Sequence, residues 1–204
     1  MKNYNVVFIS GTPGTGKTTI ANNLKKELES KYLVEVLSIN EIAIDNNLIL
    51  DFNEEKNYKV IDINNLNIKL NEIIDNYKNQ YNHFISKNKN NTKLIKPKIL
   101  IVEGHITHLL NGCDKLIVLR LNPKILENRL EKRKYIKEKI QDNLESESLG
   151  LCSSEGYELY ENKLNEIDTT NKTIEEITRI AIEIIEDKSS LPIGNVDFLD
   201  WFLK

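Results

Sequence analysis

Apolar and polar residues follow two patterns along the chain, one typical of buried strands and one typical of amphipathic helices. Short, nearly all-apolar runs predict strands at Tyr4–Ser10, Tyr32–Ile39, Lys98–Glu103, Lys115–Leu121 and Lys163–Asp168. Between them, apolar residues recur at intervals of three and four and predict helices at Lys17–Ser30, Ile63–Phe84, Lys124–Lys134, Glu138–Glu147 and Ile174–Glu186. Strands that alternate with helices predict an α/β fold, with a parallel five-stranded sheet and helices on both faces.

The first predicted strand and helix are joined by GTPGTGKT, Gly11 to Thr18, which matches the P-loop pattern G-x-x-x-x-G-K-[ST]. Its glycines let successive backbone N–H groups point inward, and the helix adds the positive end of its dipole, so we expect a phosphate nest. Lys17 would bridge the β- and γ-phosphates of ATP, Thr18 would ligate Mg²⁺, and Thr19 would reach the α-phosphate. The predicted nucleotide-binding residues of this segment are Gly14, Thr15, Gly16, Lys17, Thr18 and Thr19.

Composition narrows the possible surroundings and partners. The 204 residues fit one domain, and a net charge of −3 argues against a broad nucleic-acid surface, so we expect no sequence-specific nucleic-acid binding. Cys113 and Cys152 lack the spacing of a zinc or redox motif, which favours the reducing cytoplasm. No run approaches the roughly 18 apolar residues of a membrane span, so we expect no membrane association. The asparagine- and lysine-rich stretch Ser86–Lys98 is expected to be a solvated loop or insertion.

Two residues after the third predicted strand fit a nucleotide site. Glu103 ends that strand, where its carboxylate would hold a magnesium water; a solvated acid at the strand end is the alternative. An imidazole ordinarily titrates near neutral pH, so His105 would orient or deprotonate an attacking hydroxyl or water, unless it is a structural loop histidine. His108 and His83 lack such a context, and we expect them to be structural or exposed.

Three arginines follow the fourth predicted strand. Arg129 and Arg133 are four residues apart, hence on one helix face, and Arg120 follows a strand. Their guanidinium groups would gather around the transferring phosphates. The alternative is a solvated basic helix, paired with Glu127 and Glu131.

Two segments near the C-terminus each allow two interpretations. The turn Asp168–Thr173 either caps the following helix or wraps an adenine ring, with Lys172 lying over the ring. The final segment LPIGNVDFLDWFLK either docks on its own core or offers its aromatic residues to a partner.

Taken in order, the segments GTPGTGKTT, VEGH, CDKLIVLR, LENRLEKRKY, KIQDNLESE and NVDFLDWF resemble the adenylate kinase isoenzyme 6 family, the small nuclear-type or archaeal-type adenylate kinases also known as ribosome assembly factors. The resemblance covers most of the chain. It implies a nucleoside monophosphate kinase that uses ATP with Mg²⁺ and accepts AMP and other monophosphates. It also implies an accompanying ATPase activity and binding to a small-subunit ribosomal protein during rRNA maturation.

Carried onto this sequence, the resemblance implies a kinase domain over 1–188, with a monophosphate-binding region at about 39–62 and a lid at about 131–141, followed by a tail at 189–204. Arg133 would be the lid arginine, in RKY where the family has Arg-Gly-Tyr, and Lys172 would lie beside the adenine. The catalytic residues would be Lys17, His105, Arg129 and Arg133, with Thr18 and Glu103 serving the metal.

The sequence departs from the family pattern in two places. The region 39–62 has no arginine to grip an acceptor phosphate, and Lys56 and Lys59 are its cations. The segment 78–96 is longer than the family requires. Three functions therefore stay open: a metabolic enzyme that interconverts adenine nucleotides, an ATPase that serves small-subunit assembly, and a P-loop kinase of a small non-nucleotide alcohol.

Overall fold

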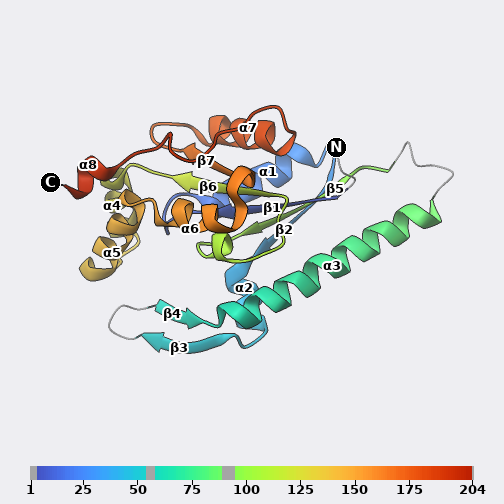
Figure 1. The fold of residues 1–204 in the computed structure, drawn as a ribbon, viewed down its shortest axis with the longest axis horizontal. Coiled ribbons are helices and arrows are strands. Elements are labelled where there is room, and N and C mark those ends of the chain that lie inside the picture. Colours follow the sequence, from blue (N-terminus) through green and yellow to red (C-terminus); the bar gives the residue numbers. More distant parts are fainter. Residues whose placement is uncertain (1–3, 54–57, 89–94, 204) are drawn as a thin grey trace.

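The computed structural model describes residues 4–53, 58–88 and 95–203 of the chain. Its centre is a parallel five-stranded sheet in the order β2-β5-β1-β6-β7 (Figure 1). The strands are β1 (Tyr4–Ser10), β2 (Leu33–Ser38), β5 (Lys98–Glu103), β6 (Lys115–Arg120) and β7 (Leu164–Asp168). All five predicted strands and their parallel arrangement are confirmed.

Helices cover both faces of the sheet, because successive residues of each strand point to opposite sides. On one side Val7 of β1 packs in a core built with α1 (Lys17–Leu28) and α7 (Ile174–Ile185). On the other side Phe8 packs in a second core. The elements on that side are α2 (Ile39–Asp45), α3 (Ile63–Lys87), the 3₁₀ turn η2 (Thr107–Leu109) and α6 (Leu151–Tyr160).

A third apolar cluster lies beside the sheet, between α4 (Pro123–Lys132) and α5 (Lys137–Ser148). Its buried members are Leu121, Leu126, Leu130, Ile140 and Leu144. Trp201, on the short helix α8 (Leu199–Phe202), packs against this cluster from the C-terminal segment. These helices confirm the two predicted from the apolar spacing, with ends shifted by one or two residues.

The region 39–62 contains elements that the sequence pattern did not predict. After α2 the chain forms an antiparallel hairpin of β3 (Ile49–Asn53) and β4 (Tyr58–Ile61), which stands apart from the main sheet (Figure 1). Leu50, Phe52 and Val60 of the hairpin are exposed, so no buried face marks the two strands in the sequence. Lys56 lies outside the described residues.

The expected loop over Ser86–Lys98 is wrong at both ends. Ser86 and Lys87 continue α3, and Lys98 begins β5. Lys98 is buried, with its ammonium 2.6 Å from the Glu35 carboxylate and over the ring of Tyr77. Residues 89–94 lie outside the described part. Within the described ranges, no helix has both the length and the apolar character that a membrane crossing requires.

Candidate active site

The P-loop between β1 and α1 curls at three glycines with positive φ: Gly11 (135°), Gly14 (100°) and Gly16 (108°). A Cβ on Gly11 would lie 2.4 Å from the carbonyl oxygen of Leu119, and one on Gly14 would lie 2.7 Å from a methyl of Leu126. Neither position tolerates a side chain, so glycine is required for both the backbone angle and the close approach to β6 and α4. The predicted loop therefore forms, with the first turn of α1 directly behind it.

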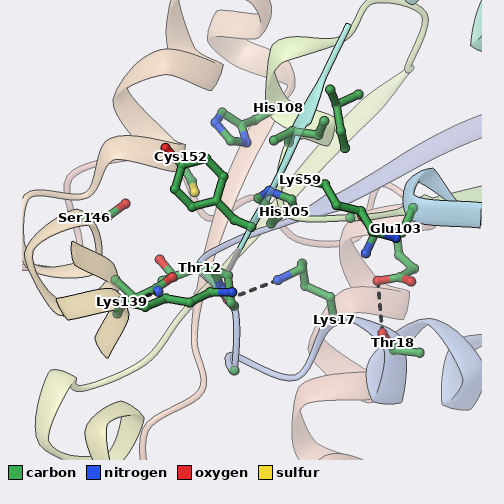
Figure 2. Close-up of a pocket in the computed structure, with 18 of the residues that line it drawn as sticks. Thr12, Lys17, Thr18, Lys59, Glu103, His105, His108, Lys139, Ser146 and Cys152 are labelled. Atoms are coloured by element: carbon green, nitrogen blue, oxygen red, sulfur yellow. Dashed lines mark hydrogen bonds between the residues drawn. The ribbon is translucent and has the colours of Figure 1, made fainter. Parts of the chain in front are cut away.

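Lys17 folds back over this loop. Its ammonium donates hydrogen bonds to the carbonyl oxygens of Gly11 (2.7 Å) and Thr12 (3.0 Å), as Figure 2 shows for Thr12. Burial lowers the pKa of Lys17 to about 8, because the charged form loses water, although Glu103 and Glu147 favour the charge. An ammonium desolvated in this way has a strong preference for an arriving anion.

Thr18 and Glu103 meet at the carboxyl edge of the sheet. The hydroxyl of Thr18 donates to the carboxylate of Glu103 at 3.1 Å (Figure 2). Glu103 ends β5 beside Ile9 of β1 and is buried. A hydroxyl and one carboxylate beside a phosphate nest match the oxygen donors that Mg²⁺ takes in nucleotide sites, where it keeps several waters. These residues therefore fit a magnesium ion held jointly with phosphates.

A cleft of about 870 Å³ opens from the P-loop and extends to the hairpin, near the upper end of the range of about 300–1,000 Å³ for small-molecule sites. Its walls come from the P-loop, α2, the β3–β4 hairpin, the loop after β5, α5 and α6. Three cations reach it from separate elements besides Lys17: Lys59 of the hairpin, Arg133 after α4, and Lys139 of α5. Figure 2 draws Lys17, Lys59 and Lys139 around this pocket. Cations from several elements thus reach the cleft, together with the carboxylates of Glu103, Asp142 and Glu155.

His105 lies in the loop after β5 and lines the same cleft. Burial lowers its pKa to about 4, and Lys17 is the next largest cause. The imidazole is therefore neutral near pH 7 and has one nitrogen free to accept a proton. This state suits the predicted role of orienting or deprotonating a nucleophile.

The three predicted arginines do not gather at one point. Arg133 lines the cleft, whereas a guanidinium nitrogen of Arg129 donates to the carbonyl oxygen of Gly14 at 3.1 Å, beside the P-loop. Arg120 is buried and bonded to the carboxylates of Glu147 and Glu166, so its expected place among the phosphates is wrong. A strand-end arginine with two buried acids is already neutralised and holds structure together.

Lys172 lies in the turn after β7 and is exposed. The turn is tied to the end of β6, because Thr169 donates from its backbone to the carbonyl oxygen of Arg120 at 2.8 Å. It is therefore at the carboxyl edge of the sheet, but Lys172 is not among the residues that line the cleft. Its place beside an adenine stays a prediction.

Sequence reasoning missed a whole face of α5. Lys139, Asp142, Asn143 and Ser146 all line the cleft, and their spacing of three and four puts them on one side of the helix. Burial lowers the pKa of Lys139, which also lies 4.5 Å from the ring of Tyr135. These four polar residues recur at helical spacing on the side away from the apolar residues Ile140 and Leu144, and this pattern could have predicted a polar face of the helix from the sequence.

His108 was expected to be structural or exposed, and it is buried; His83 is exposed. His108 reaches the wall of the cleft from η2 and contacts Ser10 and Glu155. In the described residues, no group of three or more histidines, cysteines or carboxylates is placed to hold a metal by itself.

Comparison with known proteins agrees with this arrangement. Residues 7–150 match a family model described as "AAA domain". A "Putative adenylate kinase" of Methanothermobacter thermautotrophicus is 41% identical over 103 residues, which are 50% of this chain and 60% of that protein. Another protein of this name, from Methanocaldococcus jannaschii, is 36% identical over 194 residues, which are 95% of this chain and 93% of that protein.

Among solved structures, a sugar kinase of Janibacter sp. aligns with a TM-score of 0.54 at 14% identity, over 90% of this chain and 95% of that one. At this identity the likeness concerns the fold alone. The predicted P-loop α/β fold is confirmed.

Proposed function

The chain belongs to the family of archaeal proteins named "Putative adenylate kinase", and from this premise we propose that it transfers the γ-phosphoryl group of ATP to a nucleoside monophosphate, with AMP as the main acceptor. In this reaction an oxygen of the AMP phosphate forms the new bond to the γ-phosphorus. The bond from that phosphorus to the β–γ bridging oxygen breaks, and two ADP result.

The observation that carries the proposal is the continuity of the cleft. One space of about 870 Å³ joins the P-loop to the hairpin, with cations contributed by the P-loop segment, the hairpin and α5. A triphosphate alone would occupy only the part of the cleft beside the P-loop. The further extent of the cleft, up to Lys59 and the exposed ring of Phe52, suits a second ligand that has both a phosphate and a base.

The residues around the P-loop would supply the charge that phosphoryl transfer requires. Lys17 would exchange the carbonyl oxygens of Gly11 and Thr12 for the β- and γ-phosphates. Thr18 and Glu103 would hold Mg²⁺, directly and through a water, and the ion would neutralise charge on the migrating group. Arg133, which also lines the cleft, would add the charge of its guanidinium group.

His105 has a different place in the chemistry. A phosphate monoester has its second pKa near 6, so an acceptor phosphate is already an anion near pH 7 and needs no base. A water molecule does need one. His105, neutral in the cleft, would therefore serve the hydrolysis of ATP, which we propose as an accompanying activity.

The flanking segments would complete the kinase domain of residues 1–188. The hairpin region 39–62 would bind the monophosphate, and the segment 131–141, which joins α4 to α5, would act as a lid that carries Arg133. Arg129 would hold the P-loop through Gly14. Lys172 would lie beside the adenine of ATP.

Initial rates of ADP formation from ATP and Mg²⁺, with each nucleoside monophosphate in turn, test the proposal. We expect AMP to give the largest stimulation over ATP alone. The absence of stimulation by every monophosphate would contradict the kinase, and the rate without acceptor measures the ATPase directly.

A second function has its own support. The acceptor region lacks an arginine, which weakens the grip on a monophosphate, and Leu199, Phe202 and Leu203 of the tail 189–204 are exposed. We propose as the alternative an ATPase that assembles the small ribosomal subunit, with these side chains meeting a ribosomal protein. Stimulation of ATP turnover by a purified small-subunit ribosomal protein, and not by AMP, would favour this alternative.

A further inference from the structure

Three side chains beside the cleft form a hydrogen-bonded series that the reaction scheme above does not use. They are Ser10 at the end of β1, His108 in η2 and Glu155 on α6. Nδ1 of His108 lies 2.7 Å from the Ser10 hydroxyl, and Nε2 lies 2.9 Å from the carboxylate of Glu155. The Ser10 hydroxyl also lies 3.2 Å from the carbonyl oxygen of His105. The series thus ends at the loop that carries the candidate base.

The order serine, histidine, carboxylate resembles a hydrolytic triad, but burial excludes that role. Ser10 has no exposed surface, and a nucleophile must reach its substrate. His108 is 3% exposed, whereas the side chain of Glu155 is 50% exposed. The series is therefore a buried contact between β1, η2 and α6, and only its last member, Glu155, is exposed to solvent.

A count of protons shows that the three contacts cannot all be made in the ordinary charge state. The hydroxyl of Ser10 has one proton; if it is donated to the carbonyl oxygen of His105, Nδ1 of His108 must donate to Ser10. A neutral imidazole then has no proton on Nε2, which faces the carboxylate of Glu155. All three contacts therefore need one extra proton on the pair His108–Glu155.

Without that proton, one contact is lost. In this state His108 is neutral and has its single ring proton on Nε2, which donates to the carboxylate of Glu155. Nδ1 has no proton and accepts the hydrogen bond from the hydroxyl of Ser10. The carbonyl oxygen of His105 loses its donor. The protonation of the pair thus decides whether Ser10, the residue before the P-loop, is bonded to the loop of His105.

We propose that His108 and Glu155 are positioning residues, which hold the loop of His105 against the base of the P-loop when the pair carries this extra proton. The inference rests on the proposed function, because the positioned group is the candidate base of that same site. The proton on the pair His108–Glu155 would thus regulate the site without being transferred in the reaction.

The charges around His108 favour uptake of the proton when nucleotide binds. Burial lowers the pKa of His108, and the charge of Lys17 on α1 lowers it further. Glu155 on α6 and the backbone of His105 in the preceding loop both raise it. Phosphates in the cleft would add negative charge and neutralise Lys17, and both changes favour a protonated pair. Arrival of ATP should therefore stabilise the contact between Ser10 and the carbonyl oxygen of His105.

Calorimetry of ATP·Mg binding in buffers of different ionisation enthalpy, at pH 7, measures this uptake. We expect wild-type protein to bind a fraction of a proton per ATP, and His108→Gln and Glu155→Gln to bind a smaller fraction; Lys17, whose pKa is about 8, supplies the remainder in all three proteins. His83→Gln is the matched control, since His83 is exposed on α3, and it should keep the wild-type uptake. Unchanged uptake in both variants of the pair would overturn the inference. Glu155→Gln covers the case in which His108→Gln does not fold.

The second readout is kinetic. In ATP hydrolysis, His108→Gln should lower kcat about tenfold or more, with KM for ATP within about threefold, because a displaced base affects the reaction and not the phosphate nest. The fall of kcat with rising pH should move to lower pH in Glu155→Gln. An identical pH profile in wild type and Glu155→Gln would contradict the inference. Failure of AMP to stimulate ATP turnover would contradict the proposed kinase activity. The calorimetric and kinetic tests of His108 and Glu155 would stay valid, because they need only ATP.

Discussion

The hydroxyl of Thr12 in the P-loop donates a 2.5 Å hydrogen bond to the carboxylate of Glu147, 135 residues later on α5. Glu147 also accepts from Arg120 and from the backbone of Leu121, each at 2.9 Å. Arg120 in turn donates to Glu166 on β7 at 2.7 Å. These side chains are buried, so the P-loop is joined to β6, α5 and β7 through one network of charges.

Replacing Glu147 by alanine should destabilise the protein by about 3–5 kcal/mol, because Arg120 would stay buried with half of its compensation removed. Chemical denaturation measures the change. Glu158→Ala, at an exposed site on α6, is the control and should stay within about 0.5 kcal/mol of wild type. A loss of less than about 1 kcal/mol in Glu147→Ala would show that the network contributes little to stability.

The C-terminal segment reaches the same network from outside. The backbone N–H of Gly194 donates to Glu166 at 2.9 Å, and the ring of Phe198 lies over the guanidinium of Arg120 at 5.5 Å. Trp201 is half-buried against α4 and α5, whereas Phe202 is 46% exposed. The segment therefore docks on the core while part of its apolar surface faces outward.

Trp201 and Phe202 form a matched pair for testing the two interpretations of this segment. Trp201→Ala should lower the free energy of unfolding by about 1–2 kcal/mol through lost burial, and Phe202→Ala should change it by less than about 0.5 kcal/mol. Thermal melts of both variants decide this. If Phe202→Ala costs as much as Trp201→Ala, its exposed ring is not available to a partner.

Lys17→Ala should lower both phosphotransfer and ATP hydrolysis by at least about 10²–10³-fold, because the ammonium beside Gly11 and Thr12 is a preorganised charge in the cleft. Steady-state rates at saturating ATP measure the loss. Lys26→Ala, an exposed site on the same helix, should leave both rates unchanged. Wild-type turnover in Lys17→Ala would refute the assignment of the phosphate site.

His105→Ala should impair ATP hydrolysis by about 10²-fold while ATP affinity stays within about threefold, because the imidazole lines the cleft without belonging to the P-loop. Phosphotransfer to AMP should be affected less, since an acceptor phosphate needs no base. Comparison of the two rates in one preparation gives the answer. An equal loss of ATP binding would make His105 a structural residue.

The sequence predicted the elements whose physical cause is local. Buried strands and the glycine loop follow from short-range patterns, and the side chain of Lys17 comes to the phosphate nest by its position in the motif. The prediction for Arg120 was wrong because its partners Glu147 and Glu166 are 27 and 46 residues away, and no local sequence pattern indicates these contacts. The hairpin was missed for a related reason, since both faces of its strands are largely exposed and so carry no alternation.

The hairpin also carries the last prediction. Lys59 stands opposite Phe52 in the hairpin ladder, so a cation and an aromatic ring are neighbours on one face, and both line the cleft. Because the region lacks an arginine, Lys59→Ala should raise KM for AMP about tenfold, the loss expected for one charge-assisted hydrogen bond, and leave KM for ATP unchanged. Lys78→Ala, an exposed site on α3, should change neither constant. If KM for ATP rises instead, Lys59 serves the triphosphate, and the acceptor must bind at another wall of the cleft.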